Sequence, residues 1–348
     1  MSPTSRPHGL SYNERASPHL EKTGRFMGQS EVSVMRAGYR SFAAECAALL
    51  FCLSMGIQTA QAQKVLRWKF EPGDSRDMTI VQTIHVAVTA ADQNVEMRMS
   101  PTMVLRQVID SVNAEGIASV TQRFVRIQMK LEGAPGASFA YDSNVETPAE
   151  GPIGSMIAPI FGALTKGKFT AHISPRGEIL DVQVPEEMTD AMARAAGLPG
   201  VAEIFSKDGL NQLLKQNAAK FPEQAVIRGD SWTDSLELNN PILGKQTIKT
   251  KFTYAGEEVV NDRKVDKMSV TLSFEFGDPP ANAPAKIKVS EQAASGVMRF
   301  DAATGQLVGS EIDQTMKMEI NALGNVLNQT IKSKTIVTVA PSPKSANP

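Results

Sequence analysis

The sequence is poor in cysteine: its 348 residues include two, Cys46 and Cys52, and both lie within the first 62 residues. The rest of the chain therefore has no disulfide, no thiol nucleophile and no cysteine-ligated zinc. The formal net charge is −1, which gives no electrostatic attraction to nucleic acid. Disulfide scaffolds, thiol enzymes and nucleic-acid-binding proteins are excluded on these grounds.

Histidine is scarce as well, and only His85 and His172 lie beyond residue 62. Each occupies an expected strand position without a second histidine or a carboxylate at ligand spacing, so no metal site is predicted, although two histidines assembled in space would allow one. The sequence also has no phosphate-binding loop and no dinucleotide fingerprint. We therefore predict neither a metal nor a cofactor.

The first 62 residues have the order of a secretory signal peptide behind a polar leader. Residues 1–34 are polar, 35–40 are basic, 47–57 are apolar, and Ala60-Gln61-Ala62 is a small-x-small cleavage pattern. The apolar run is too short to span a bilayer. The pattern predicts an exported protein, periplasmic or extracellular, that is soluble and not integral to the membrane after cleavage near Ala62.

The remaining chain alternates apolar and polar residues with the period of a strand. Examples are residues 64–71, 78–88 and 268–276, and similar alternation recurs through about ten segments. Alternation that puts the apolar residues on one face is typical of an antiparallel sheet whose other face is exposed to solvent. Gly256-Glu257 is predicted to be a turn, and residues 286–292 and 296–301 are predicted to pair as strands. The alternation of apolar and polar residues shifts by one position near Phe124-Val125, which predicts a bulge there.

Helical spacing appears in the middle of the chain. Residues 153–164 carry apolar side chains at helical spacing, with Pro159 inside the segment, and shorter helices are predicted at 186–197 and 207–220. A hairpin is expected over 168–184. Helices must cover the apolar face of the sheet, so we predict an α+β fold: a large, curved, half-barrel-like antiparallel sheet with helices on its concave face.

One domain is expected over residues 63–340, with a disordered tail at 341–348. Residues 63–220 and 221–340 show a weak internal similarity, since in both parts a Gly-Asp-Ser triplet precedes a strand. Duplication explains this similarity, and so does convergence on a common hairpin.

Gly229-Asp230-Ser231-Trp232 is the most distinctive local pattern. It is similar to the opening block of Gly-Asp-Ser esterases, in which the serine is the nucleophile. Those enzymes need a histidine base, and no histidine follows Ser231. We therefore favour a structural motif, with Gly229 and Asp230 in a turn and Trp232 packed as an anchor, and we predict that the protein is not an enzyme.

Three motifs together resemble a known family: Trp68 to Asp74 after the signal peptide, Phe221 to Trp232, and Gly296 to Gly305. The family consists of exported bacterial proteins whose domain has no assigned function, and the resemblance spans residues 64–340. It implies no catalytic residues. At the level of the fold, the expected outline is also similar to the periplasmic lipoprotein carriers, whose half-barrel shields acyl chains.

The sequence has 16 methionines and 6% aromatic residues, a composition that suits either a plastic apolar site or ordinary core packing. The leading hypothesis is a non-catalytic protein that binds a lipid-like ligand or an envelope partner such as a lipoprotein. An envelope scaffold without ligand is the alternative, and a Ser231 esterase is third. The residues predicted to line the ligand site are Met97, Met99, Met156, Ile157, Ile160 and Phe161.

Overall fold

The computed structural model describes residues 63–90, 93–133, 138–145, 151–190, 219–240, 244–277, 285–322 and 325–342. The chain separates into two compact units, Met1–Ala60 and Gln61–Pro348. The predicted leader and signal peptide, residues 1–62, lie outside the described part.

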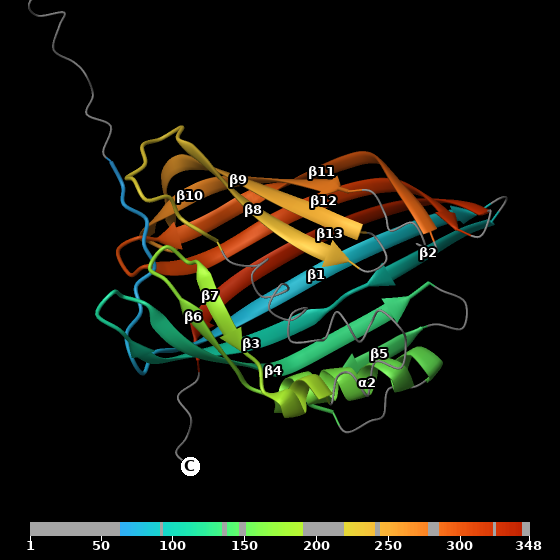
Figure 1. Cartoon of the computed structure of the whole chain (residues 1–348), viewed down its shortest axis with the longest axis horizontal. Coiled ribbons are helices and arrows are strands. Elements are labelled where there is room, and N and C mark those ends of the chain that lie inside the picture. The colour runs from blue at the N-terminus through green and yellow to red at the C-terminus, as the bar shows by residue number, and fades with distance from the viewer. Residues whose placement is uncertain are drawn as a thin grey trace, which may run out of the picture. The chain divides into compact units, whose positions relative to one another are not determined.

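The described residues form one sheet of 13 strands, and every pairing in it is antiparallel (Figure 1). The predicted antiparallel sheet is thus confirmed. The strands are β1 (Ser75–Ala90), β2 (Gln93–Met99), β3 (Thr102–Val112), β4 (Ala118–Glu132), β5 (Phe139–Asp142), β6 (Phe169–Ile173), β7 (Ile179–Gln183), β8 (Ser231–Asn240), β9 (Gly244–Val260), β10 (Arg263–Phe276), β11 (Ala285–Asp301), β12 (Gln306–Ala322) and β13 (Asn325–Pro341).

The strand order shows how the chain builds this sheet. The order is β7-β6-β4-β2-β1-β13-β12-β11-β10-β9-β8, with β3 beside β1 and β4, and β5 beside β4. Strands β8 to β13 follow one another across half of the sheet, and the path then continues through β1 to β7. The sheet therefore consists of two halves, β1 to β7 and β8 to β13, joined where β1 pairs with β13 over the register from Arg76 to Ala90.

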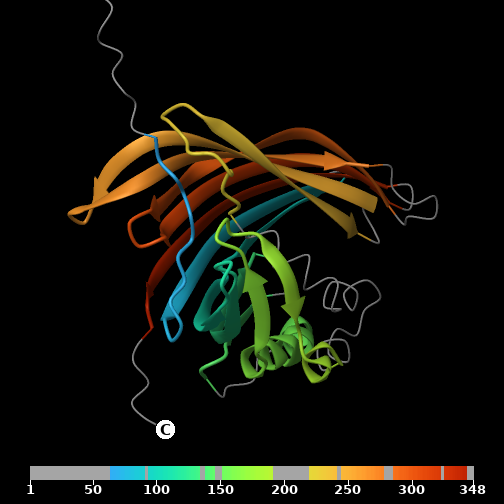
Figure 2. The same ribbon diagram turned by 60° about the vertical axis from the view of Figure 1, so that its left-hand side comes forward.

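Alternation gives the sheet one inward, largely apolar face. In β1, Ile84 is half-buried and Val86 is buried, whereas Val81, Thr83 and His85 on the other face are exposed. Directly paired residues point to the same face, so the register extends this assignment across neighbouring strands. Figure 2 shows the curvature of the sheet.

The helix α2 (Gly151–Lys166) packs against β4 and β5, and it confirms the helix predicted over 153–164. Its Ile160 joins a cluster that we call the α2 cluster, and Ala163 and Leu164 pack against it. The members of the α2 cluster are Leu105, Ile160, Phe169, Ala171, Val182, Val184 and Met188. Residues 186–190 are helical, while the rest of the predicted helix 186–197 and residues 207–218 lie outside the described part.

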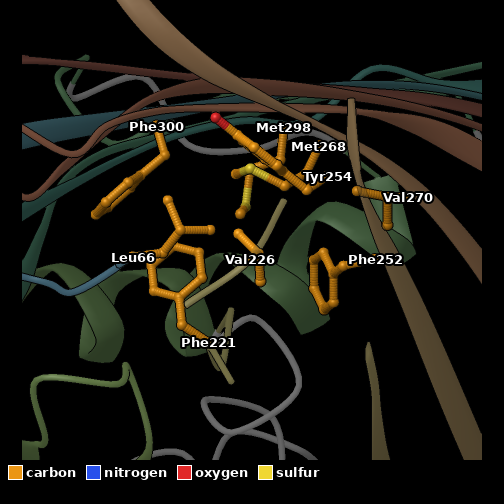
Figure 3. Close-up of a cluster of buried hydrophobic side chains, with 9 residues drawn as sticks. All are labelled: Leu66, Phe221, Val226, Phe252, Tyr254, Met268, Val270, Met298 and Phe300. Carbon is orange, nitrogen blue, oxygen red and sulfur yellow. The ribbon is translucent and has the colours of Figure 1, made fainter. Parts of the chain in front are cut away.

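A second cluster fills the inward face under β9 to β12, and two extended segments cover it (Figure 3). We call these segments the straps: residues 63–70 and residues 219–227. The strap cluster consists of Leu66, Phe221, Val226, Phe252, Tyr254, Met268, Val270, Met298 and Phe300. The straps supply the first three of these side chains.

The prediction of a strand at 64–71 is wrong. Residues 63–70 make an isolated bridge at Lys64–Val226 and otherwise bond to loops, as in Trp68 N–H to the Pro175 carbonyl. The alternation is nevertheless real, because Leu66 and Trp68 face the cluster while Val65 is 56% exposed. A segment stretched over a core has the same period of two as a strand within a sheet.

Two other predictions are corrected by the strand bounds. Gly256-Glu257 is no turn: β9 continues to Val260, Gly256 lies at a bulge, and the turn falls at Asn261 and Asp262, which both have positive φ. Residues 286–292 and 296–301 belong to one strand, β11, whose register against β12 shifts near Ser290.

Two finer predictions are confirmed. The register of β4 against β3 shifts between Val104 and Leu105 so that Val125 is skipped, which is the bulge expected near Phe124-Val125. Strands β6 and β7 form the hairpin expected over 168–184.

Candidate functional site

The inward face continues as an apolar surface beyond the two clusters. One register row crosses four strands through Met316, Ile331, Val86 and Met97. Met316 and Val86 are buried, at 7% and 5% exposure, and their two neighbours are half-buried. We call this row, with the adjacent Ile84, Met99 and Met318, the distal face, since it lies toward the end of the sheet where β1 finishes.

The predicted ligand residues occupy two places. Met97 and Met99 belong to the distal face, and Met99 lies opposite Leu131 of β4. Ile157, Ile160 and Phe161 are on α2. The side chain of Met156 lies outside the described residues.

Strands β4 and β5 link these two groups. Leu131 pairs with Phe139 of β5, and Tyr141 of β5 contacts the ring of Phe161 on α2, with centroids 5.2 Å apart. Paired residues and residues two apart share a face, so Met99, Leu131, Phe139 and Tyr141 lie on one face, and the distal face and α2 both adjoin it.

Two glutamines place polar groups on the inward face. Gln82 Nε2 donates to Thr335 Oγ1 at 3.1 Å. Gln246 Nε2, at the start of β9, is buried and has no hydrogen-bond partner within the described ranges. A mostly apolar surface with a few polar groups that orient a ligand is typical of small-molecule sites.

The Gly-Asp-Ser-Trp motif is built as a turn into β8. Gly229 has φ +99, a conformation that glycine adopts without a steric penalty, and the Asp230 carboxylate accepts the Ile227 N–H at 2.9 Å. The Ser231 hydroxyl lies 2.8 Å from the Thr253 hydroxyl across the β8–β9 ladder. In this geometry Ser231 has a hydroxyl neighbour rather than a catalytic base.

Trp232 joins the sheet to the second strap. Its ring stacks on Phe252 with centroids 5.4 Å apart, and its Nε1–H donates to the Lys220 carbonyl at 2.8 Å. The apolar and polar ends of the indole are thus both occupied.

Beside Trp232 the structure contains a pocket of about 360 Å³ that the sequence did not reveal. It opens between the second strap and the start of β8, two segments that lie close together only after folding. The lining residues are Arg176, Lys220, Phe221, Pro222, Glu223, Gln224, Trp232, Thr233 and Asp234.

Two arginines hold the strap at this pocket. Arg67 donates to the carbonyls of Pro222 and Glu223 at 2.7 and 2.6 Å. Arg176 donates to the Phe221 carbonyl at 2.9 Å and to the Glu223 carboxylate at 2.6 Å. The pocket wall is therefore fixed by charge-assisted hydrogen bonds.

The charges around the pocket are paired with one exception. Arg176 pairs with Glu223, and Lys220 pairs with Glu178 at 2.9 Å. Asp234 accepts the Ser235 N–H and forms no ion pair with any residue that the structure describes. The lining itself has two carboxylates, Glu223 and Asp234, and two cations, Arg176 and Lys220, and Asp234 is the carboxylate without an ion pair among the described residues.

A buried polar group lies within the strap cluster. Asp266 is 2% exposed and accepts a hydrogen bond from the Tyr254 hydroxyl at 2.8 Å, and Lys64 Nζ lies 3.5 Å from the same carboxylate. Burial, followed by the Asp266 contact, raises the pKa of Tyr254, and the hydrogen bond to Glu257 raises that of Lys64. The period-two pattern gave no sign that this inward position carries a charge.

His172 does have a carboxylate partner, contrary to the sequence analysis. Its Nδ1 lies 2.6 Å from Asp181 Oδ1, because the β6–β7 register places the two residues opposite one another. His85 lies 3.4 Å from the Arg98 guanidinium. Across the described ranges, no group of three histidine, cysteine, aspartate or glutamate side chains is arranged to hold a metal ion.

The fold defines a mostly β protein built on one large antiparallel sheet. Within it, residues 115–263, from β4 into the start of β10, match the model of a family described as a family of unknown function (DUF6263). The expected resemblance to a family without assigned function is confirmed. No curated protein sequence matches the chain.

Solved structures give only remote likenesses. A lipovitellin structure titled for lipid–protein interactions has 12% identity and a TM-score of 0.37, and the match covers 80% of this chain but 27% of that one. DynF from the dynemicin pathway of Micromonospora chersina has 9% identity and a TM-score of 0.19, over 82% and 93% of the two chains. OpdQ of Pseudomonas aeruginosa has 9% identity and a TM-score of 0.21, over 76% and 99%.

TM-scores this low do not establish that the chain shares a fold or a function with these proteins. Among the residues that the structure describes, no helix is long and apolar enough to cross a membrane.

Proposed function

We propose that this protein is an exported, non-catalytic carrier that holds a lipid-like apolar ligand on the concave side of its sheet. The observation that carries the proposal is the row Met316–Ile331–Val86–Met97, an apolar surface that continues past both core clusters. Val86 and Met316 are already buried, so the area open to a ligand is that of half-buried members such as Met97 and Ile331; burying it would stabilise a bound alkyl chain by about 25 cal/mol per Å². Either a free lipid or the acyl chains of a lipoprotein would supply that area.

Methionine is well suited to this role. Met97, Met99, Met316 and Met318 contribute unbranched, polarizable side chains to the distal face, and such side chains adapt to ligands of varied shape. An aromatic surface of equal area would be more rigid.

In this proposal α2 is the cover on the concave side. It contacts β4 and β5, next to the strand that carries Met97 and Met99. Pro159 has no N–H to donate within the helix, which favours bending at that point. Bending would let the first half of α2 move while Ile160 stays in the α2 cluster.

A probe-displacement experiment with matched variants tests the proposal. The chain from Gln63 onward should bind the fluorescent apolar probe N-phenyl-1-naphthylamine saturably, and long-chain lipids should displace it. Met97→Lys, which places a charge on the distal face, should weaken binding at least about tenfold, because burying an unpaired charge is costly. Thr83→Lys, the same charge on the exposed outer face, should bind as the parent does. Equal binding by both variants would place the ligand elsewhere.

Protein purified from its own host gives the second test, by native mass spectrometry. The proposal expects a chain that begins at Gln63 and carries a lipid-sized adduct that is lost on denaturation. A bare chain that also fails to bind the probe would favour the alternative, an envelope scaffold without ligand. A mass that includes residues 1–62 would contradict export by cleavage near Ala62.

A further inference from the structure

The pocket beside Trp232 adjoins a free strand edge. Strand β8 ends the sheet order, and β9 is the sole partner strand that the described residues give it. An edge strand exposes a row of backbone N–H and C=O groups that can pair with another chain. The pocket is lined by residues 232–234 of this same strand.

The ladder shows which backbone groups are free. Tyr254 N–H donates to the Asp230 carbonyl, and the Tyr254 carbonyl accepts from Gly229, so even-numbered residues of β8 turn their backbone groups toward β9. The N–H and C=O of Thr233 therefore point away from the sheet. Thr233 lies on the pocket wall, between Trp232 and Asp234.

The charge of the pocket selects the chemistry of a partner. Asp234 is the lining carboxylate without an ion pair among the described residues, and its side chain is half-buried. A lysine or arginine side chain inserted beside it would gain a charge-assisted contact in partly desolvated surroundings. The arginines that fix Pro222 and Glu223 keep the opposite wall in place before any partner arrives.

We propose that β8 and this pocket form a docking site for an extended, basic segment of a partner protein. The segment pairs with the backbone of Thr233 as an added strand and places a lysine or arginine side chain on Asp234. Added strands of this kind gain affinity from main-chain hydrogen bonds and specificity from side-chain pockets. The site is separate from the distal face, so it stands or falls independently of the carrier function.

Short labelled peptides test the charge preference. Fluorescein-labelled Thr-Val-Thr-Xaa-Thr-Val-Thr, with lysine, norleucine or glutamate at Xaa, is titrated with the chain from Gln63 onward and followed by anisotropy. The lysine peptide should bind saturably and at least about tenfold tighter than the other two, as expected for a charge-assisted contact of about 1.4 kcal/mol or more. Asp234→Asn should remove this preference. Glu237→Gln, on the exposed side of β8 and paired with Lys245, should keep it.

Two N-methylated lysine peptides test strand addition without altering the protein. One is methylated at odd positions and the other at even positions, so each has one blocked edge. Strand addition predicts that one abolishes binding and the other does not. Equal binding of both, or equal affinity for lysine and glutamate, would overturn the proposal.

The competing role for Asp234 is protection of the edge, since inward charges on edge strands prevent sheets from pairing with one another. In that case the Asp234→Asn variant would elute as a dimer from a size-exclusion column, and the parent protein would not bind the lysine peptide. That outcome too would overturn the proposal.

Discussion

At the scale of single residues, Trp232 shows how one side chain serves both stability and a surface. It stacks on Phe252, bonds to the Lys220 carbonyl and lines the pocket. Trp232→Ala should lower the free energy of unfolding by about 3 kcal/mol, the low end for tryptophan truncation because the side chain is half-exposed. Chemical denaturation measures this change. Ser231→Ala, which removes a hydroxyl contact at an exposed position, is the control and should cost under about 0.5 kcal/mol.

Asp142 makes part of the stability depend on pH. Its hydrogen bond to Arg126 lowers its pKa from 3.8 to about 2, with backbone and Gln128 contacts adding to the effect. Because the folded pKa lies below the unfolded value, this stabilisation is complete above about pH 4 and is lost as the pH falls through about 2.

The variant Asp142→Asn should therefore be less stable than the parent at pH 7 and equal to it near pH 2. Urea unfolding of both proteins at several pH values provides the measurement. A stability difference that stays constant across this range would show that the Arg126 contact contributes nothing through charge.

At the scale of elements, the first strap matters because a few side chains hold it. Leu66 is 1% exposed inside the strap cluster, whereas its neighbour Val65 is 56% exposed. Leu66→Ala should cost about 3 kcal/mol, within the usual range for buried leucine, and Val65→Ala should cost under about 0.5 kcal/mol. Thermal unfolding compares the two variants. Similar losses at both positions would mean that the strap does not depend on its buried side chain.

The element-level predictions succeeded where a local pattern decides the structure. Helical spacing gave α2, and the slip in parity gave the bulge at Val125. They failed where tertiary context decides. The alternation of residues 64–70 arises from packing over a cluster. Gly256 lies at a bulge inside β9, and the hairpin turn falls at Asn261 and Asp262, which adopt the positive φ that such a turn requires.

At the scale of the molecule, the sequence predicted one large antiparallel sheet but not its order. Alternation reports which face of a strand is buried and not which strand lies beside it, so the pairing of β1 with β13 was not foreseeable. The pocket was missed for the same reason, because Arg176, Glu223 and Asp234 come together from three separate segments. The order does place the strands of residues 63–220 and those of residues 221–340 in separate halves of the sheet, and duplication of the two parts stays a prediction.

The pairing of β1 with β13 has a consequence for biosynthesis. The strand that completes the centre of the sheet, β13, is made after the other described strands, while its partner β1 is made before them. Until β13 is made, β1 presents an unpaired edge along its length, and such edges promote association with other chains. The nascent protein therefore needs protection until β13 emerges, and chains truncated before β13 should aggregate rather than accumulate as folded half-sheets.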